Sequence, residues 1–324
     1  MSLLVVGSVA YDSVRTPAGS RDRALGGSAM YFSVAASCLT EVSLVGIVGD
    51  DFERTHVHML EARGVDVSGL EYAEGKTFHW SGVYSTEDVN QRETLDTQLN
   101  VFEEFNPTLN PRQRDSDFVF LANIDPALQL RVLEQMKRRP RLVALDSMNF
   151  WIDGRRDDLD RIVRGVDLFF LDEGEARSYA GEFNIVRAAR RIQDMGPRAV
   201  VVKRGEHGVL VFDDDDIFSA PAFPLDSVVD PTGAGDSFAG GFMGLLAATG
   251  DTSRAGIRRA AIVGSVMGSF AVQDFSADRL TSITPSDIQD RFDNFVRLTQ
   301  FDGDGLKIES GFLPVSLRAR SANN

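Results

Sequence analysis

Short apolar runs alternate with longer amphipathic segments along most of the chain. The runs are rich in Val, Leu, Ile and Phe with little polar alternation, as in strands buried on both faces of a parallel sheet. They cover residues 3–9, 42–49, 117–122, 141–146, 166–172 and 199–203. Helix-like periodicity appears at 28–40, 51–63 and 126–139, and again in the last third at 235–249, 253–273 and 284–298. The alternation predicts an α/β fold, a doubly wound and mostly parallel sheet flanked by helices.

One segment departs from this rhythm. Residues 76–102 alternate polar and apolar positions, carry several aromatic side chains and contain a turn signal near residues 86–91. This pattern is typical of a β-hairpin. Insertions of this kind commonly close a ligand site, so we predict a small inserted β lid, with an edge extension of the main sheet as the alternative. The rest is predicted to form one domain over 1–302, followed by a partly disordered tail at 303–324.

Composition narrows the classes of partner. The net charge of −14 argues against a nucleic-acid or anionic-membrane partner, because neither would meet a basic face. Local amides and a metal ion can still hold a phosphate. The single cysteine, Cys38, excludes an internal disulfide and fits a reducing compartment. The N-terminal residues lack the basic region of a signal peptide and no apolar stretch is long enough to span a bilayer, so we expect a cytoplasmic protein.

The most informative short stretch is "VVDPTGAGDSFAGGFMG", residues 228–244. Gly233, Ala234 and Gly235 stand where a loop becomes a helix, and the first turn of a helix offers unpaired N–H groups to an anion. Small residues let a phosphate approach the backbone closely. Asp236 then lies beside that anion, where a carboxylate can take a proton from an attacking hydroxyl. The alternative is an acid that the helix dipole alone favours.

Two weaker features are expected to lie at the same edge of the sheet. "LGGSAMYFSVAAS" (25–37) places Gly26 and Gly27 directly before an apolar helix, and "GSVAYD" (7–12) ends the predicted first strand with Asp12. Ligands of open α/β sheets bind at the carboxyl ends of the strands. A carboxylate there can accept hydrogen bonds from two hydroxyls of a polyol. Each feature alone is also compatible with a simple turn or cap.

"DPTGAGDSFAGGF" resembles the signature of the ribokinase-like, or PfkB, family of carbohydrate and nucleoside kinases, and "GGSAMYFSVAAS" resembles that family's first signature. The resemblance covers about residues 1–300. It implies a ribokinase-like fold with a lid and transfer of the γ-phosphoryl group of ATP to a hydroxyl. It further implies that Asp236 is the general base and that the amides of Gly233, Ala234 and Gly235 form the anion hole.

The resemblance also implies positions for the acceptor. Asp12, Gly26 and Gly27 would contact the acceptor sugar. Members that act on phosphorylated sugars, and ribokinase itself, tend to carry Lys directly after the two glycines and Asn three positions later, where this chain has Ser28 and Tyr31. Loss of the lysine removes a charge for a substrate phosphate, and Tyr31 adds an aromatic face suited to stacking on a base or sugar ring. Both changes favour an unphosphorylated sugar, cyclitol or nucleoside. Against that, Lys76 and Arg92 on the predicted lid could supply positive charge, and Arg21 and Arg23 lie just before the glycines.

Two further segments correspond to the family's nucleotide and metal elements. "LDEGEA" (171–176) matches an Asn-x-x-Glu element, with Asp172 in place of Asn and Glu175 kept, so both carboxylates are magnesium candidates. The alternative for Asp172 is a cap of the helix that begins there. "VVKRGEHGVLVF" (201–212) resembles the strand and turn near the nucleotide. The candidates for contact with ATP are Lys203, Arg204, Gly205 and Thr232; a plain turn residue is the alternative for the first two. Potassium is common near the matching loop in relatives.

The sequence therefore predicts an ATP-dependent kinase of a small sugar. A nucleoside or cyclitol kinase is the first alternative, and a catalytically silent ATP- or sugar-binding regulator is an alternative of another class. A dinucleotide-dependent oxidoreductase is disfavoured because "GSVAYD" lacks G-x-G-x-x-G. On the lid, His79 and Trp80 either touch the substrate or pack the hairpin. Lid hairpins often pair edge to edge, so a homodimer through the lid is expected.

Overall fold

A central sheet organises the computed structural model, which describes residues 1–87 and 91–300. Its strand order is β13-β12-β11-β10-β9-β8-β1-β4-β5, and all neighbours are parallel except the β11–β12 and β12–β13 pairs. The strands are β1 (Leu3–Val6), β4 (Val42–Gly49), β5 (Val65–Ala73), β8 (Phe118–Leu121), β9 (Leu142–Asp146), β10 (Leu168–Asp172), β11 (Ala199–Lys203), β12 (Val209–Asp213) and β13 (Asp216–Ala220). The predicted mostly parallel sheet is confirmed.

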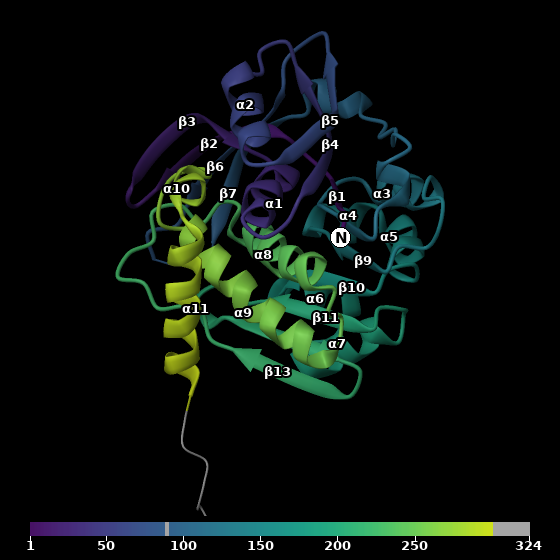
Figure 1. The fold of residues 1–324 in the computed structure, drawn as a ribbon, viewed down its shortest axis with the longest axis vertical. Coiled ribbons are helices and arrows are strands. Elements are labelled where there is room, and N and C mark those ends of the chain that lie inside the picture. Colours follow the sequence, from purple (N-terminus) through teal and green to yellow (C-terminus); the bar gives the residue numbers. More distant parts are fainter. Residues whose placement is uncertain (88–90, 301–324) are drawn as a thin grey trace, which may run out of the picture.

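Helices cover both faces of this sheet (Figure 1). One face carries α1 (Ser28–Ser37), α2 (Arg54–Ala62), α8 (Ala234–Thr249), α9 (Arg254–Ala271), α10 (Asp278–Ser282) and α11 (Pro285–Thr299). The other carries α3 (Pro126–Glu134), α4 (Asn149–Gly154), α5 (Arg156–Val163), α6 (Glu173–Ala180) and α7 (Ile185–Gln193). Each face has its own apolar cluster, so the doubly wound arrangement is confirmed.

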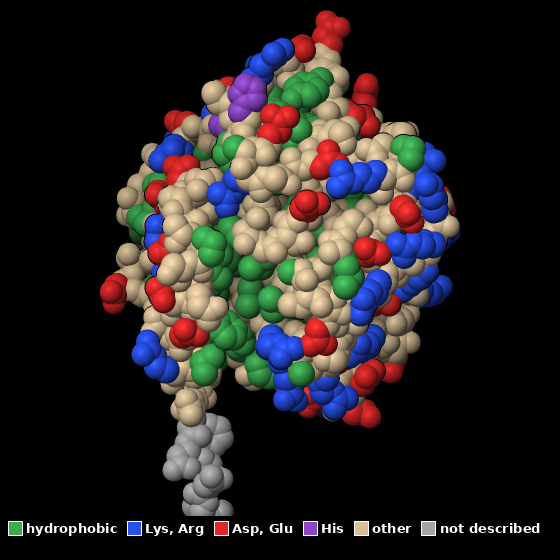
Figure 2. Space-filling model, in the orientation of Figure 1, with side chains coloured by type: hydrophobic (Ala, Val, Ile, Leu, Met, Phe, Trp, Pro, Cys, Tyr) green, Lys and Arg blue, Asp and Glu red, His purple; other side chains and the backbone are tan. Residues whose placement is uncertain are grey.

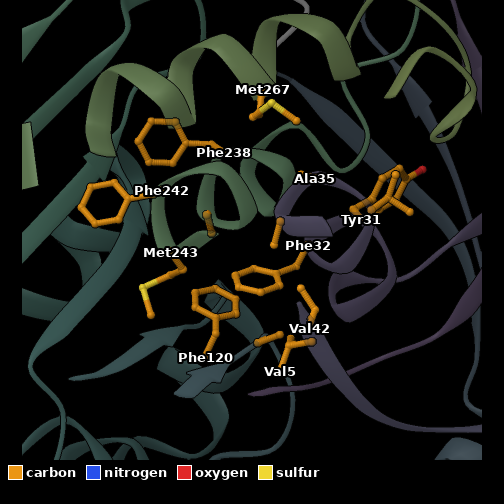
Figure 3. Close-up of a cluster of buried hydrophobic side chains, with 14 of the residues drawn as sticks. Val5, Tyr31, Phe32, Ala35, Val42, Phe120, Phe238, Phe242, Met243 and Met267 are labelled. Carbon is orange, nitrogen blue, oxygen red and sulfur yellow. The ribbon is translucent and has the colours of Figure 1, made fainter. Parts of the chain in front are cut away.

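Close helix packing fixes α8 in the middle of its layer, against α1 and α9. A Cβ added at Gly240 would lie 2.5 Å from the Phe32 carbonyl oxygen, and one at Gly241 would lie 2.6 Å from the Met267 side chain. Below them Phe32 stacks on Phe120 with ring centroids 4.3 Å apart, within the cluster drawn in Figure 3. Gly240 and Gly241 therefore hold α8, and the loop at its start, at a fixed place over the sheet.

A second, four-stranded sheet stands beside the first, in the order β3-β2-β6-β7. Its strands are β2 (Ala10–Thr16), β3 (Gly19–Gly26), β6 (Phe78–Tyr84) and β7 (Arg92–Gln98). The β2–β6 pair is parallel and the other two pairs are antiparallel. The predicted segment 76–102 thus supplies β6, β7 and the short 3-10 helix η1 (Asn100–Glu104), in a sheet separate from the main one. We call this four-stranded sheet the lid sheet.

The structure corrects the prediction for the N-terminal residues. The apolar run 3–9 suggested one strand with Asp12 at its end, but β1 ends at Val6 and Asp12 lies within β2 of the lid sheet. Half of the lid sheet therefore comes from residues 10–26. This part was missed because residues 15–23 are mostly polar or turn-forming and show no alternating apolar pattern.

Two predicted features fall partly or wholly outside the described residues. They are the turn of the lid hairpin, in part (88–90), and the tail at 303–324. Over residues 1–87 and 91–300, no helix has the length and apolar character needed to cross a bilayer. In the view of Figure 2, acidic and basic side chains are interspersed over the surface.

Candidate active site

The start of α8 forms the centre of the candidate site. Gly233 is the N-cap, with a left-handed φ of 72°, and Ala234 is the first helical residue. The amides of Gly233 and Gly235 have no acceptor in the described part of the chain, whereas the Ala234 N–H donates to the Pro231 carbonyl at 3.2 Å. Two of the three predicted anion-hole amides are therefore free to bind an anion. Asp236 is the acid of the first helical turn.

Asp236 lies in an electrostatic environment suited to proton transfer. Burial, followed by the charge of Asp146, raises the pKa of its carboxyl to about 6, although Lys203 and Arg92 act in the opposite direction. Lys203, at the end of β11, donates a hydrogen bond of 2.7 Å from Nζ to Oδ2 of Asp146, at the end of β9. A Cβ added at Gly235 would lie 3.2 Å from Lys203 Nζ, so this lysine reaches the first turn of α8. The site thus combines a carboxyl group that is ionised above about pH 6 with a fixed cation.

Asp172 and Glu175 lie at the end of the strand between those two, where β10 becomes α6. They form a capping box: Oδ1 of Asp172 accepts from the Glu175 N–H, and Oε2 of Glu175 accepts from the Asp172 N–H, both at 2.7 Å. Burial and the charge of Asp172 raise the pKa of Glu175 to about 8, despite the lowering effect of Lys203. The structure therefore realises the alternative cap role of Asp172.

The same carboxylates gather negative charge that would attract a divalent cation. Burial is the largest cause of the raised pKa of Glu175, and the charges of Asp172 and Asp146 add to it, against the opposite effect of Lys203. Across the two described ranges, however, no three His, Cys, Asp or Glu side chains are grouped so that they could hold a metal ion. A cation here would need oxygen atoms of the nucleotide or of water to complete its ligands.

Asp12, Gly26 and Gly27 do come together, as predicted, although Asp12 reaches the site from the lid sheet. A Cβ at Gly26 would lie 2.1 Å from an Asp12 carboxylate oxygen, and one at Gly27 would lie 2.5 Å from the Ser8 carbonyl oxygen. A larger residue at either position would therefore clash with Asp12 or with the Ser8 backbone, so both positions require glycine. Burial, followed by the charges of Asp230 and Asp236, raises the pKa of Asp12 to about 7.

The stacking surface predicted at Tyr31 is wrong. Tyr31 is 1% exposed, and a Cβ at Gly233 would lie 2.3 Å from its ring, so the ring face is covered by the glycine loop. The hydroxyl group points away from the apolar cluster (Figure 3) and has no hydrogen-bond partner among the described residues. Burial and the nearby charges of Asp12 and Asp230 raise the pKa of this phenol well above its usual range.

The remaining nucleotide candidates lie in different surroundings. Arg204 donates from Nε to Glu173 at 2.7 Å, and Gly205 begins the 3-10 turn η3 (Gly205–His207). Thr232 donates from Oγ1 to the hydroxyl oxygen of Tyr84, on the lid sheet, at 3.1 Å. Thr232 therefore ties the glycine loop to the lid sheet.

Three residues that face this site were not predicted from the sequence in the role they have here: Asp146, Tyr84 and Arg92. Arg92 on β7 pairs in register with Tyr84 on β6, forms a hydrogen bond with it, and lowers the pKa of both Asp12 and Asp236. Asp146 had a signal, because it ends the apolar run 141–146 as Asp172 ends its own. Arg92 was noted only as a lid charge, since its partners are set by strand pairing.

Comparison with known proteins decides the family. The sequence profile described as "pfkB family carbohydrate kinase" matches residues 2–283. The chain belongs to the pfkB family of carbohydrate kinases. It is 32% identical over 250 residues to the cytidine kinase of Thermococcus kodakarensis, which covers 75% of this chain and 87% of that protein. It is 27% identical over 285 residues to a nucleoside kinase of Methanothermobacter thermautotrophicus, covering 84% and 89%.

A solved structure shows the same fold for this pfkB-family kinase. The nucleoside kinase of Methanocaldococcus jannaschii, an archaeal member of the ribokinase family, superposes with a TM-score of 0.72 at 19% identity, covering 90% of this chain and 98% of that one. The predicted ribokinase-like fold and family are confirmed. The protein is thus an ATP-dependent phosphotransferase with a sugar-like acceptor, and its family implies a divalent metal with the nucleotide.

Proposed function

We propose that Asp236 takes the proton of the acceptor hydroxyl while that hydroxyl attacks the γ-phosphorus of ATP. The observation that carries this proposal is the place of Asp236 in the first turn of α8, beside the free amides of Gly233 and Gly235. The O–P bond to the acceptor forms as the bond to ADP breaks, and the proton moves to a carboxylate oxygen of Asp236. With a pKa of about 6, this carboxylate is ionised at neutral pH.

The N–H groups at the start of α8 would stabilise the negative charge of the transferred phosphoryl group. The amides of Gly233 and Gly235 point at that group, and Ala234 joins them if its bond to Pro231 opens. Lys203 supplies a positive charge that Asp146 holds in place. A magnesium ion, when bound, would neutralise phosphate charge, and Glu175 is the carboxylate best placed to hold it, directly or through water, with Asp172 orienting Glu175 through the capping box.

The acceptor is proposed to lie between the lid sheet and α1. Asp12 would accept hydrogen bonds from its hydroxyls, and the bare backbone at Gly26 and Gly27 would allow the close approach. ATP would lie along the β11 side, near Lys203 and Arg204. In this scheme residues 1–302 form one catalytic domain and the lid sheet excludes water from the reacting phosphate.

A ribonucleoside is the second candidate acceptor. The relatives described above include a cytidine kinase and two nucleoside kinases, and the chain lacks the lysine that would favour a phosphorylated sugar. The catalytically silent regulator, the alternative of another class, is disfavoured. Asp236 beside the free amides argues for catalysis, because a protein that only binds ATP needs no general base.

The proposal also includes a bound potassium ion, a homodimer and a cellular compartment. Asp230 is buried and accepts the N–H groups of Thr232 and Ser276, at 2.9 and 3.3 Å, and we propose that its negative charge helps to hold a potassium ion near the glycine loop. The exposed edge strand β7 is the proposed dimer contact, which sedimentation of the full chain tests. We propose a cytoplasmic location.

One experiment tests the function directly. ADP release from Mg-ATP is measured over a panel of sugars, cyclitols, phosphosugars and nucleosides, with the wild type and Asp236→Asn in parallel. We expect acceptor-dependent turnover that falls by about 10²-fold or more in the variant. Turnover that survives would place the base elsewhere. Tight ATP binding without transfer to any acceptor would favour the regulator.

A further inference from the structure

The inner face of the lid sheet carries a tryptophan that no part of the scheme above uses. Tyr84 on β6 meets Thr232 beside the glycine loop, so the face that bears Tyr84 is the face toward the site. Side chains of a strand alternate between faces, so Trp80, Gly82 and Tyr84 share it. Asp12, which reaches the site from β2, pairs in parallel register with Trp80 and therefore points the same way.

Trp80 is held in place by its own sheet. A Cβ added at Gly82 would lie 2.3 Å from the six-membered ring of the indole, so this ring rests on the bare backbone of Gly82. The indole Nε1 donates to Thr94 Oγ1 at 3.3 Å, and the Arg92 guanidinium lies 5.9 Å from the ring centroid. These three contacts come from β6 and β7 and fix the plane of the ring.

This bracing does not serve the apolar core. Trp80 is only partly buried and belongs to neither of the two apolar clusters of the main sheet. An aromatic ring that is fixed on one side and not packed into a core is an ordered surface for another flat group. The strand neighbour of Trp80 on that face is the proposed hydroxyl-binding Asp12.

We propose that Trp80 is the stacking platform for the base of a nucleoside acceptor and sets the preference for nucleosides over free sugars. Adjacent strands lie about 4.8 Å apart, so a ring stacked on Trp80 sits beside the group bound to Asp12. A lone sugar held by Asp12 leaves the indole uncovered, whereas a ribose with an attached base covers both. This inference rests on the proposed function, and it replaces Tyr31, whose ring face is covered, as the aromatic specificity residue.

The neighbouring His79 provides a matched control. It precedes Trp80 on β6 but points to the outer face, where its Nε2 lies 2.9 Å from Ser13 Oγ. A substitution there perturbs the same strand without touching the inner face. From the sequence, His79 and Trp80 had the same two alternatives. The structure places them on opposite faces of the lid sheet.

The test compares acceptor KM values for wild type, Trp80→Ala, Trp80→Phe and His79→Ala, with ribonucleosides and with free ribose. We expect Trp80→Ala to raise the nucleoside KM by roughly tenfold or more, since base stacking on an aromatic side chain is of that order, with kcat and the ribose KM little changed. Trp80→Phe should keep most of the affinity and His79→Ala nearly all of it. Equal losses for nucleoside and ribose, or a wild type without preference for nucleosides, would overturn the inference.

A binding measurement separates this inference from the proposed reaction. The chain has two tryptophans, so Trp151→Phe leaves Trp80 as the only indole fluorophore. Nucleosides should quench its fluorescence, whereas ribose at the same occupancy should not. Quenching without any turnover would retain the stacking site while the kinase proposal fails. Turnover of nucleosides without quenching would retain the kinase and refute the platform.

Discussion

At the scale of single residues, the site is defined by carboxyl groups whose burial raises their pKa. Asp236 has a pKa of about 6, and the base must be ionised to accept a proton. We therefore expect kcat at saturating acceptor to fall as pH decreases below about 6, by roughly tenfold per pH unit. Saturation matters because Asp12, the proposed acceptor ligand, has a pKa of about 7, so its ionisation would change acceptor binding in a neighbouring pH range. A kcat that stays constant between about pH 5 and 8 would contradict the assignment of the base.

Tyr31 gives a prediction about stability. Its hydroxyl is buried and has no partner in the described part of the chain, and an unpaired buried hydroxyl costs free energy. Tyr31→Phe should therefore raise the free energy of unfolding of the ligand-free protein by about 1 kcal/mol in urea titration. Gly233→Ala, the matched change across the same contact, should lower it, because the φ of 72° is strained for alanine and its Cβ would overlap the Tyr31 ring. Destabilisation by Tyr31→Phe would reveal a partner for the hydroxyl.

At the scale of elements, the lid sheet brings Arg92 of β7 to the end of α8. Arg92 lowers the pKa of Asp236 and bonds Tyr84, which in turn bonds Thr232 beside the glycine loop. Arg92→Gln should therefore lower kcat by roughly tenfold or more and move the kinetic pKa of the base upward, since a nearby positive charge is lost. Tyr84→Phe, which keeps the arginine, should leave that pKa nearly unchanged. An unshifted pKa in Arg92→Gln would mean that the lid charge does not reach the base.

At the scale of the whole molecule, the site costs stability. Asp12, Glu175 and Asp236 have raised pKa values in the folded state, so the folded protein binds more protons than the unfolded chain between about pH 5 and 8. The free energy of unfolding contributed by these groups therefore falls as pH rises through this range. Differential scanning calorimetry should show the ligand-free Tm falling toward about pH 8, and Mg-ATP offsetting the loss.

Glu175→Gln isolates one of these groups. Glutamine resembles the protonated acid and can still accept the Asp172 N–H, so the variant should exceed wild type in Tm by about 2 °C or more at high pH, with the difference shrinking as pH falls. Glu173→Gln should instead lower the Tm at high pH, because the hydrogen bond from Arg204 holds the pKa of Glu173 below its usual range and the substitution removes that charged interaction. A variant at Glu175 that is less stable than wild type at about pH 8 would contradict the raised pKa.

The sequence predicted some strands and site residues better than others. The apolar runs identified most central strands of the main sheet. The edge strand β5, whose burial is mixed, was not recognised. Half of the lid sheet was missed because β3 is mostly exposed and polar, and an exposed strand leaves no alternating signal. Asp12 was identified as a site residue on the wrong strand, since Gly7 and Ser8 end β1 earlier than the apolar run suggests.

The sequence by itself determined the fold class, the family and the loop at 233–236, because burial periodicity and the order of small residues, acid and helix are local properties of the chain. Only the tertiary structure decided which charges surround Asp236 and which aromatic ring is free. Lys203, Asp146 and Arg92 reach it from β11, β9 and the lid sheet, and their meeting depends on strand order. In the same way, packing against Gly233 covers Tyr31, whereas Gly82 holds Trp80 on the inner face of the lid sheet.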